Sequence, residues 1–183
     1  MKLEPTSVDG AFLVHVEPRH DERGFFGRIW CEREFAEAGV DVAWRQANVG
    51  FSHTALTLRG IHFQGPPDAE AKLVRCTRGR VFDVAVDLRP SSATYRRWTG
   101  HELTAENGRM LLVPEGCGHA YLTLEDDSEI IYLTSAFYAP DSASGARWND
   151  PAFGIEWPAA PSTISEQDAG WPAWSADHEG GTS

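Results

Sequence analysis

The sequence predicts an all-β fold, a sandwich or barrel built from many short strands. Alternating and short apolar runs dominate the chain, turn signals separate them, and only one stretch has helical character. The runs typical of strands are residues 11–16, 56–63, 72–75, 81–88, 110–113, 120–124 and 130–137. Many short strands at this spacing are typical of two packed sheets or a barrel.

The remaining elements follow from helix and turn signals. Residues 32–38 are expected to form a helix, with Phe35 as its core contact and Gly39 as its stop signal. Residues 77–80 and 125–128 carry glycine, aspartate and serine, which are typical of turns. The segment 177–183 is polar and glycine-rich, so we expect a flexible C-terminal tail there.

Length and charge limit the function classes. The 183 residues, 42% of them apolar, suit a single globular domain, which we place at residues 1–176. The net charge of −11 argues against nucleic acid and anionic membranes as partners, because binding to their phosphates needs a basic surface. It does not exclude a small anionic ligand, since a local cluster of arginines outweighs the global field within a Debye length.

The cysteines and the N-terminus indicate the compartment. Cys31, Cys76 and Cys117 have neither paired nor metal-like spacing, which fits a reducing environment. The first residues lack the apolar run of a signal peptide, and no run reaches membrane-spanning length. We therefore expect a cytoplasmic protein.

Lys72 is the first candidate functional residue. Among the 16 lysines and arginines, only Lys2 and Lys72 are lysines. A compact ammonium can stabilise a single developing oxyanion or share a proton, whereas a guanidinium stays charged and planar. Chance explains one retained lysine equally well when it is considered alone. The preceding segment adds weight, because it carries both Arg59 and His62.

A turn at residues 114–119 resembles the second signature of the cupin jelly roll. Its proline and two glycines shape a turn that delivers His119 to the start of the next strand. The first cupin signature normally offers two histidines and a glutamate to a metal, whereas here Phe63 and Gln64 follow His62. Two imidazoles without a nearby carboxylate make a poor divalent site, so we expect no metal.

Without a metal, these residues suit acid–base chemistry. An imidazole ordinarily titrates near pH ~6.5, and it needs a partner that fixes its tautomer. Asp168 is a candidate partner for His62. Tyr132 shares a strand face with Ile130 and Thr134, which places its phenol inside the barrel if that face is inward. A core tyrosine with a satisfied hydroxyl is an equally good interpretation of Tyr132 alone.

Taken together, the motifs resemble the dTDP-4-dehydrorhamnose 3,5-epimerase family, over residues 8–172. The matching segments are Arg23-Gly24-Phe25-Phe26, Gln46-Ala47-Asn48, Arg59-Gly60-Ile61-His62-Phe63-Gln64, Lys72-Leu73-Val74-Arg75, Asp83-Val84-Ala85-Val86-Asp87-Leu88-Arg89, the turn at 114–119, Tyr132, Trp157-Pro158 and Ser165-Glu166-Gln167-Asp168. Each motif is weak alone, but their order and spacing are specific.

The resemblance implies a dimeric cupin that inverts carbons next to the ketone of a nucleotide-linked 4-keto-6-deoxyhexose, with no cofactor. On the family's pattern His62 is the base, Asp168 orients it, and Lys72 lies by the ketone oxygen. Tyr132 would return a proton to the opposite face.

The resemblance also implies a set of substrate-binding residues, among which Arg23 would serve the neighbouring subunit's site. The set is Arg23, Phe26, Arg28, Gln46, Asn48, Arg59, His119 and Tyr138. Arg59 and His62 differ in strand parity, so both can face the ligand only if Gly60 marks a bulge.

Three departures from the family pattern concern the substrate rather than the proton transfers. Arg28 and Ala143 stand where the family usually has glutamate, and Gln167 stands where it has lysine. An arginine cannot accept the hydrogen bonds that a carboxylate accepts, so the nucleobase preference stays open. The choice between C3, C5 and both centres also stays open, because it depends on tyrosine placement and ring conformation that the sequence does not display. Two alternatives are a sugar-nucleotide-binding cupin without catalysis and a metal-dependent cupin enzyme.

Overall fold

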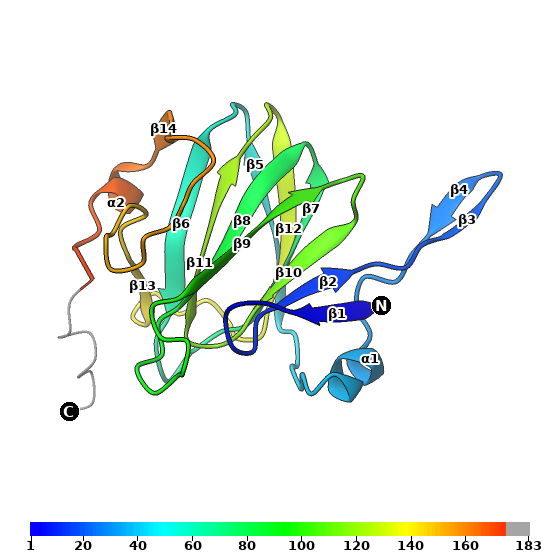
Figure 1. The fold of residues 1–183 in the computed structure, drawn as a ribbon, viewed down its shortest axis with the longest axis horizontal. Helices are drawn as coiled ribbons and strands as arrows, with labels where there is room; N and C mark the ends of the chain where they lie inside the picture. The colour runs from blue at the N-terminus through cyan, green and yellow to red at the C-terminus, as the bar shows by residue number, and fades with distance from the viewer. Residues whose placement is uncertain (175–183) are drawn as a thin grey trace.

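Two mainly antiparallel sheets face each other and enclose the core (Figure 1). The computed structural model describes residues 1–174. The first sheet has the strand order β1-β2-β10-β7-β12-β5, and the second has the order β13-β6-β11-β8-β9, with β14 paired in parallel to β6. The prediction of an all-β cupin jelly roll with one or two short helices is therefore confirmed, and residues 1–174 contain two.

The strands are short, as the turn spacing predicts. The first sheet contains β1 (Lys2–Pro5), β2 (Phe12–His15), β5 (Gln46–Ser52), β7 (Lys72–Arg78), β10 (Arg109–Val113) and β12 (Ser128–Thr134). The second contains β6 (Thr57–Gln64), β8 (Arg80–Asp87), β9 (Trp98–Thr104), β11 (Cys117–Thr123), β13 (Ala143–Gly145) and β14 (Thr163–Ile164). A separate hairpin consists of β3 (Arg19–Asp21) and β4 (Gly24–Phe26), and the helices are α1 (Glu32–Glu37) and α2 (Glu166–Ala169).

All seven predicted strands are present, with ends shifted by a few residues. The predicted helix is α1, in which Phe35 is buried and Gly39 follows with a φ of +81°. The short strands β1, β3, β4, β13 and β14, as well as β5 and β9, were not predicted. The tail expected at 177–183 lies outside the described residues.

Apolar side chains from both sheets fill the space between them. Leu111 and Ile130 come from the first sheet and meet Val81, Ala85 and Leu103 from the second. Two further apolar clusters cover the outer faces. One packs α1 against the first sheet through Phe35, and the other packs the segment before the C-terminus against the second sheet. The space between the two sheets is therefore filled by core residues, and each outer face is covered by a further apolar cluster.

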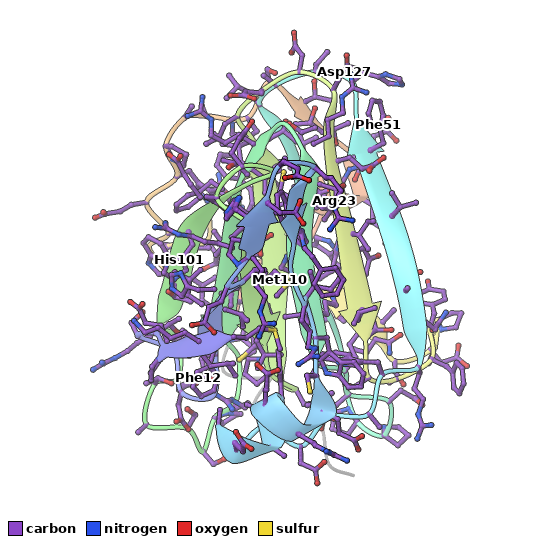
Figure 2. All side chains as sticks on the ribbon, turned by 90° about the vertical axis from the view of Figure 1, so that its right-hand side faces the viewer. Phe12, Arg23, Phe51, His101, Met110 and Asp127 are labelled. Carbon is purple, nitrogen blue, oxygen red and sulfur yellow. The ribbon has the colours of Figure 1, made fainter. Side chains whose placement is uncertain are left out.

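The β3–β4 hairpin projects away from the two sheets (Figure 1). Arg23 lies on this hairpin, in front of the sheets when the molecule is viewed from that side (Figure 2). Phe25, Phe26 and Ile29 expose large apolar side chains along the hairpin and just after it. This segment thus presents an apolar surface that the rest of the described chain, up to residue 174, does not cover.

Neither helix of residues 1–174 is long and apolar enough to cross a membrane. Cys31, Cys76 and Cys117 are all free thiols. Burial raises the pKa of Cys76 to about 11 and that of Cys117 to about 12, so both thiols are protonated and unreactive at neutral pH.

Candidate active site

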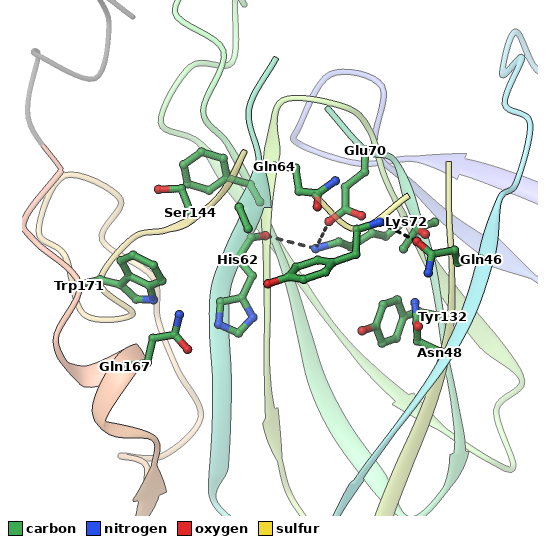
Figure 3. Close-up of a pocket in the computed structure, with 14 residues that line it drawn as sticks. Gln46, Asn48, His62, Gln64, Glu70, Lys72, Tyr132, Ser144, Gln167 and Trp171 are labelled. Atoms are coloured by element: carbon green, nitrogen blue, oxygen red, sulfur yellow. Dashed lines mark hydrogen bonds and ion pairs between the residues drawn. The ribbon is translucent and has the colours of Figure 1, made fainter. Parts of the chain in front are cut away.

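Two adjoining cavities lie between the sheets, and four residues line both of them. The first has a volume of about 550 Å³ and the second about 590 Å³. The shared residues are His62, Lys72, Tyr132 and Gln167. Three of the four predicted catalytic residues are therefore gathered around one concave space (Figure 3). A pocket with convergent titratable groups is a good candidate for an active site.

The fourth predicted catalytic residue, Asp168, contacts the imidazole of His62 through its carboxylate. His62 lies on β6 and Asp168 on α2, and the distance between His62 Nε2 and Asp168 Oδ1 is 2.6 Å. The helix is capped by Ser165, whose hydroxyl accepts a hydrogen bond from the Asp168 amide. The second carboxylate oxygen of Asp168 accepts the N–H of Gly60 at 3.1 Å. The carboxylate is thus fixed on both oxygens.

This arrangement assigns the protons of the imidazole. Burial raises the pKa of Asp168, but the hydrogen bonds that it accepts from His62 and Gly60 lower it more, so its pKa lies below the usual value. The carboxylate is therefore ionised at neutral pH and accepts the Nε2 proton of His62. The lone pair of Nδ1 is then left free, as a general base requires.

A bulge in β6 lets Arg59 and His62 face the same space. On β11, Tyr121 pairs with Arg59 and His119 pairs with His62, so β6 advances three residues while β11 advances two. Gly60 lies in this irregularity with a φ of +118°, and a Cβ atom there would come within 2.6 Å of the β11 backbone. The bulge predicted at Gly60 is confirmed, and only glycine fits it.

Lys72 begins β7 and extends between the sheets. Its Nζ lies 3.0 Å from Glu70 Oε1 and 3.4 Å from the carbonyl oxygen of His62 (Figure 3). The side chains of Lys72 and Glu70 are both about nine-tenths buried. Sequence reasoning missed Glu70, because nothing in the residues around Lys72 indicates that this carboxylate turns back toward it.

Tyr132 lies on β12 of the opposite sheet. Ile130 and Thr134, which share its strand face, also line the cavities, so this face points inward and the condition for an inward phenol is met. Burial raises the pKa of Tyr132, Glu70 raises it further, and Arg59 opposes both effects. The phenol is therefore protonated at neutral pH and able to donate a proton.

His119 forms a second histidine–aspartate pair. Its Nε2 lies 2.8 Å from Asp83 Oδ1, and both side chains are buried. Asp83 belongs to β8, next to β11 in the second sheet. Its other oxygen, Oδ2, has no hydrogen-bond partner among the described residues. Sequence reasoning did not find this pairing, since it depends on which strands are neighbours.

The predicted substrate-binding residues fall into two groups. Gln46, Asn48 and Tyr138 line the first cavity, and Arg59 and His119 line the second. The backbone N–H of Tyr138 donates to Gln46 Oε1 at 2.7 Å, which fixes the amide of Gln46 beside the cavity. These five residues are therefore brought together with the predicted catalytic residues.

Arg23, Phe26 and Arg28 line neither cavity of this chain. Arg23 is 84% exposed and pairs with Asp21 on the hairpin. Arg28 Nη1 lies 2.8 Å from Glu34 Oε1, close to α1. These three residues therefore cannot bind a ligand in the cavities of their own chain, and their substrate-binding role stays a prediction.

Two of the three departures from the family pattern lie at the cavities. Ala143 and Gln167 both line the first cavity, and Gln167 also lines the second. Trp171 completes the wall beside Gln167 (Figure 3). Within residues 1–174, no three His, Cys, Asp or Glu side chains are grouped so that they could hold a metal ion.

Comparisons with known proteins agree with this arrangement. Residues 5–176 match the family model described as dTDP-4-dehydrorhamnose 3,5-epimerase. A protein of that name from Sinorhizobium fredii is 41% identical over 174 residues, which cover 94% of this chain and 89% of the relative.

Solved structures are similar over the same length. The dTDP-4-dehydrorhamnose 3,5-epimerase of Bacillus anthracis, with TDP and PPi bound, has a TM-score of 0.91 and 36% identity, covering 94% of this chain and 99% of its own. ChmJ, a 3'-monoepimerase from Streptomyces bikiniensis in complex with dTDP-quinovose, has a TM-score of 0.87 and 35% identity, covering 96% of this chain and 90% of its own. The chain belongs to the dTDP-4-dehydrorhamnose 3,5-epimerase family.

Proposed function

We propose that this protein is an epimerase that inverts C3, C5 or both in a nucleotide-linked 4-keto-6-deoxyhexose, using only groups of the chain as acids and bases. The observation that carries this proposal is the meeting of His62, backed by Asp168, with Lys72 and Tyr132 around one cavity. The family membership agrees with it.

His62 acts as the base in this proposal. Its free Nδ1 takes the hydrogen from the carbon next to the ketone, and the electron pair of that C–H bond forms the enolate. The imidazole becomes an imidazolium, which the ionised Asp168 stabilises across 2.6 Å. A hydrogen next to a ketone becomes removable only when the enolate oxygen is also stabilised.

Lys72 supplies that stabilisation. Its ammonium lies within 3.4 Å of the His62 carbonyl oxygen, so an enolate oxygen formed beside His62 is within its reach. The positive charge is held in a buried position, where electrostatic interactions are stronger than in water. Glu70 pairs with this ammonium, so the buried positive charge of Lys72 has a partner of opposite charge.

Tyr132 returns the proton. It belongs to β12 in the first sheet, whereas His62 belongs to β6 in the second, so the two groups approach a bound sugar from opposite walls. When the phenol protonates the carbon from the side opposite His62, the configuration at that carbon is inverted. Exchange without inversion results if His62 returns the proton itself.

Two copies of the chain form the active unit in this proposal. The exposed Phe25, Phe26 and Ile29 make the hairpin segment suitable for packing on a second copy. In such a dimer the partner's hairpin would bring Arg23, Phe26 and Arg28 to the open side of the cavities, where they would bind the nucleotide. Arg28 would then lie at the nucleobase end of the ligand, so the nucleobase preference of the protein has to be tested.

A deuterium-exchange experiment tests the reaction. The protein is incubated in deuterated water with 4-keto-6-deoxyglucose linked to dTDP and, separately, to UDP, and NMR identifies the carbons that gain deuterium and change configuration. We expect deuterium at C3, C5 or both, with inversion. Binding of the sugar nucleotide without any exchange would instead support a non-catalytic binding protein. If the purified protein held a stoichiometric metal and its removal abolished exchange, the result would support a metal enzyme.

A further inference from the structure

A buried hydroxyl group in the second cavity takes no part in the mechanism above. Tyr121 lies on β11, two residues after His119 and therefore on the same strand face. Its side chain lines the second cavity together with Arg59, His62 and Tyr132, and the residue is 6% exposed. A phenol placed in a core usually has a partner for its hydroxyl, so the surroundings of this group are informative.

Space for the hydroxyl exists because residue 50 is a glycine. A Cβ atom at Gly50 would stand 3.0 Å from Tyr121 Oη, closer than atoms in ordinary contact. Gly50 is not among the residues with positive φ, so its backbone does not require glycine. The missing side chain thus leaves room for the phenol to reach the β5 side of the cavity from β11.

The neighbouring donors determine which way the Tyr121 hydroxyl points its proton. Arg59 Nε donates to Ser52 Oγ at 3.4 Å, and a guanidinium can only donate. Ser52 Oγ therefore accepts from Arg59, and Ser52 lowers the pKa of the neighbouring Tyr121. Arg59, which lines the cavity together with Tyr121, cannot accept the phenol's proton, so that proton is available to an acceptor in the cavity.

The hydroxyl keeps this proton at neutral pH. Burial raises the pKa of Tyr121 to about 12, against the opposing effects of Arg59 and Ser52. Tyr121 and Arg59 line the same cavity, and a phenol that donates beside a guanidinium favours an anionic acceptor there.

We propose that Tyr121 is a further ligand-binding residue whose hydroxyl donates a hydrogen bond to a diphosphate oxygen beside Arg59, in the space that Gly50 leaves open. This rests on the proposed function, in which the ligand is a sugar nucleotide, and on Arg59, which lines the same cavity and offers its diphosphate a guanidinium. Phosphate oxygens only accept hydrogen bonds, so they match both Arg59 and a phenol that has one proton to give.

Calorimetric binding of dTDP and UDP to the unreacted protein tests the proposal, using the nucleotide that binds more tightly. Tyr121→Phe should weaken binding about tenfold, because a hydrogen bond to a charged group contributes roughly 1.5–3 kcal/mol and tenfold corresponds to about 1.4 kcal/mol. Tyr95→Phe removes a phenolic oxygen that lies outside both cavities and should leave the affinity unchanged. Equal affinities of the unaltered protein and Tyr121→Phe would overturn the proposal.

A double-mutant cycle tests the role of Gly50. The methyl group of Gly50→Ala should displace the hydroxyl and weaken binding about as much as Tyr121→Phe does. In the Tyr121→Phe background, Gly50→Ala should add less than about a twofold loss, since the displaced oxygen is already absent. Equal losses in the two backgrounds would contradict the coupling. The melting temperature of each variant shows that the fold is kept.

These results separate this inference from the proposed function. If the protein binds the nucleotide through Tyr121 but catalyses no deuterium exchange, the inference holds and the epimerase proposal fails. If exchange proceeds and Tyr121→Phe binds the nucleotide normally, the epimerase proposal holds and the inference fails.

Discussion

The site contains two histidine–aspartate pairs on neighbouring strands, and they differ in how far each imidazole is open to the cavity. His62 and His119 are directly paired across β6 and β11, and each uses Nε2 to contact a buried carboxylate. The side chain of His62 is 44% exposed, whereas that of His119 is 8% exposed. A base must reach the carbon from which it takes a proton, so this difference supports the proposal that His62 abstracts the proton and His119 positions the ligand.

The two carboxylates are also held differently. Asp168 accepts hydrogen bonds on both oxygens and sits on α2, near the end of the described chain. Asp83 lies in the middle of β8, and its Oδ2 lacks a hydrogen-bond partner among the described residues. We propose that the His62–Asp168 pair carries charge during the reaction. This is the pair in which both carboxylate oxygens accept a hydrogen bond.

Removing the exposed imidazole should have the largest effect. His62→Ala should slow deuterium exchange into a 4-keto sugar nucleotide at least about 1000-fold, because no other group takes the proton. The NMR exchange rate measures this, and circular dichroism checks the fold. If His62→Ala exchanged deuterium normally while His119→Ala did not, the assignment of the two pairs would have to be reversed.

Asp168→Asn should have the next largest effect. An amide does not stabilise an imidazolium as a carboxylate does, and it can favour the wrong tautomer, so kcat for exchange should fall about 100-fold. The matched change Asp83→Asn should reduce kcat much less. Similar losses of kcat in both variants would contradict the functional difference between the pairs.

The same variant also gives a stability prediction. The pKa of Asp168 is lowered in the folded protein, so its contribution to the free energy of unfolding is complete above the ordinary value of about 3.9 and is lost as the pH falls toward the lower, folded value. Urea unfolding at pH 7 and pH 3 should therefore show a smaller acid-induced loss in Asp168→Asn than in the unaltered protein. An equal loss would mean that Asp168 is not linked to folding.

Tyr132→Phe tests the wall opposite His62. Exchange catalysed by His62 should stay within about fivefold of the unaltered rate, while net inversion should fall about 100-fold, because the phenol is the proposed donor on the other face. NMR reads both quantities from one sample. Equal losses of exchange and inversion would argue against Tyr132 as the opposite-face donor.

The sequence predicted the parts of the molecule that have simple patterns. Apolar runs predicted seven of the strands, and the family motifs predicted many of the residues that line the cavities, although Arg23, Phe26 and Arg28 line neither. Strand β5 was missed because its pattern is reversed. Val49 is 65% exposed on the outer face, whereas Gln46 and Asn48 line the cavity. A strand that presents polar side chains to a binding site does not show the usual apolar face.

The partners of the predicted residues could not be found in the same way. Asp83 meets His119 only because β8 and β11 are neighbours in the second sheet, and Glu70 meets Lys72 only because the chain before β7 turns toward the cavity. Such contacts depend on sheet order and on loop conformation, neither of which has a local sequence signal. The motifs therefore located the site, while its electrostatic partners became visible only in three dimensions.

The smallest expected effect concerns the buried pair itself. His119→Asn should raise KM for the sugar nucleotide about tenfold and change kcat less, because His119 is proposed to bind the ligand and not to move a proton. Steady-state kinetics over a range of substrate concentrations separates the two constants. Because Asp83 would then face an amide in place of the imidazole, the melting temperature should be measured as well, to separate a weakened site from a weakened fold. A large fall in kcat with an unchanged KM would place His119 among the groups that transfer protons, and the exposure of the imidazole would no longer distinguish the two pairs.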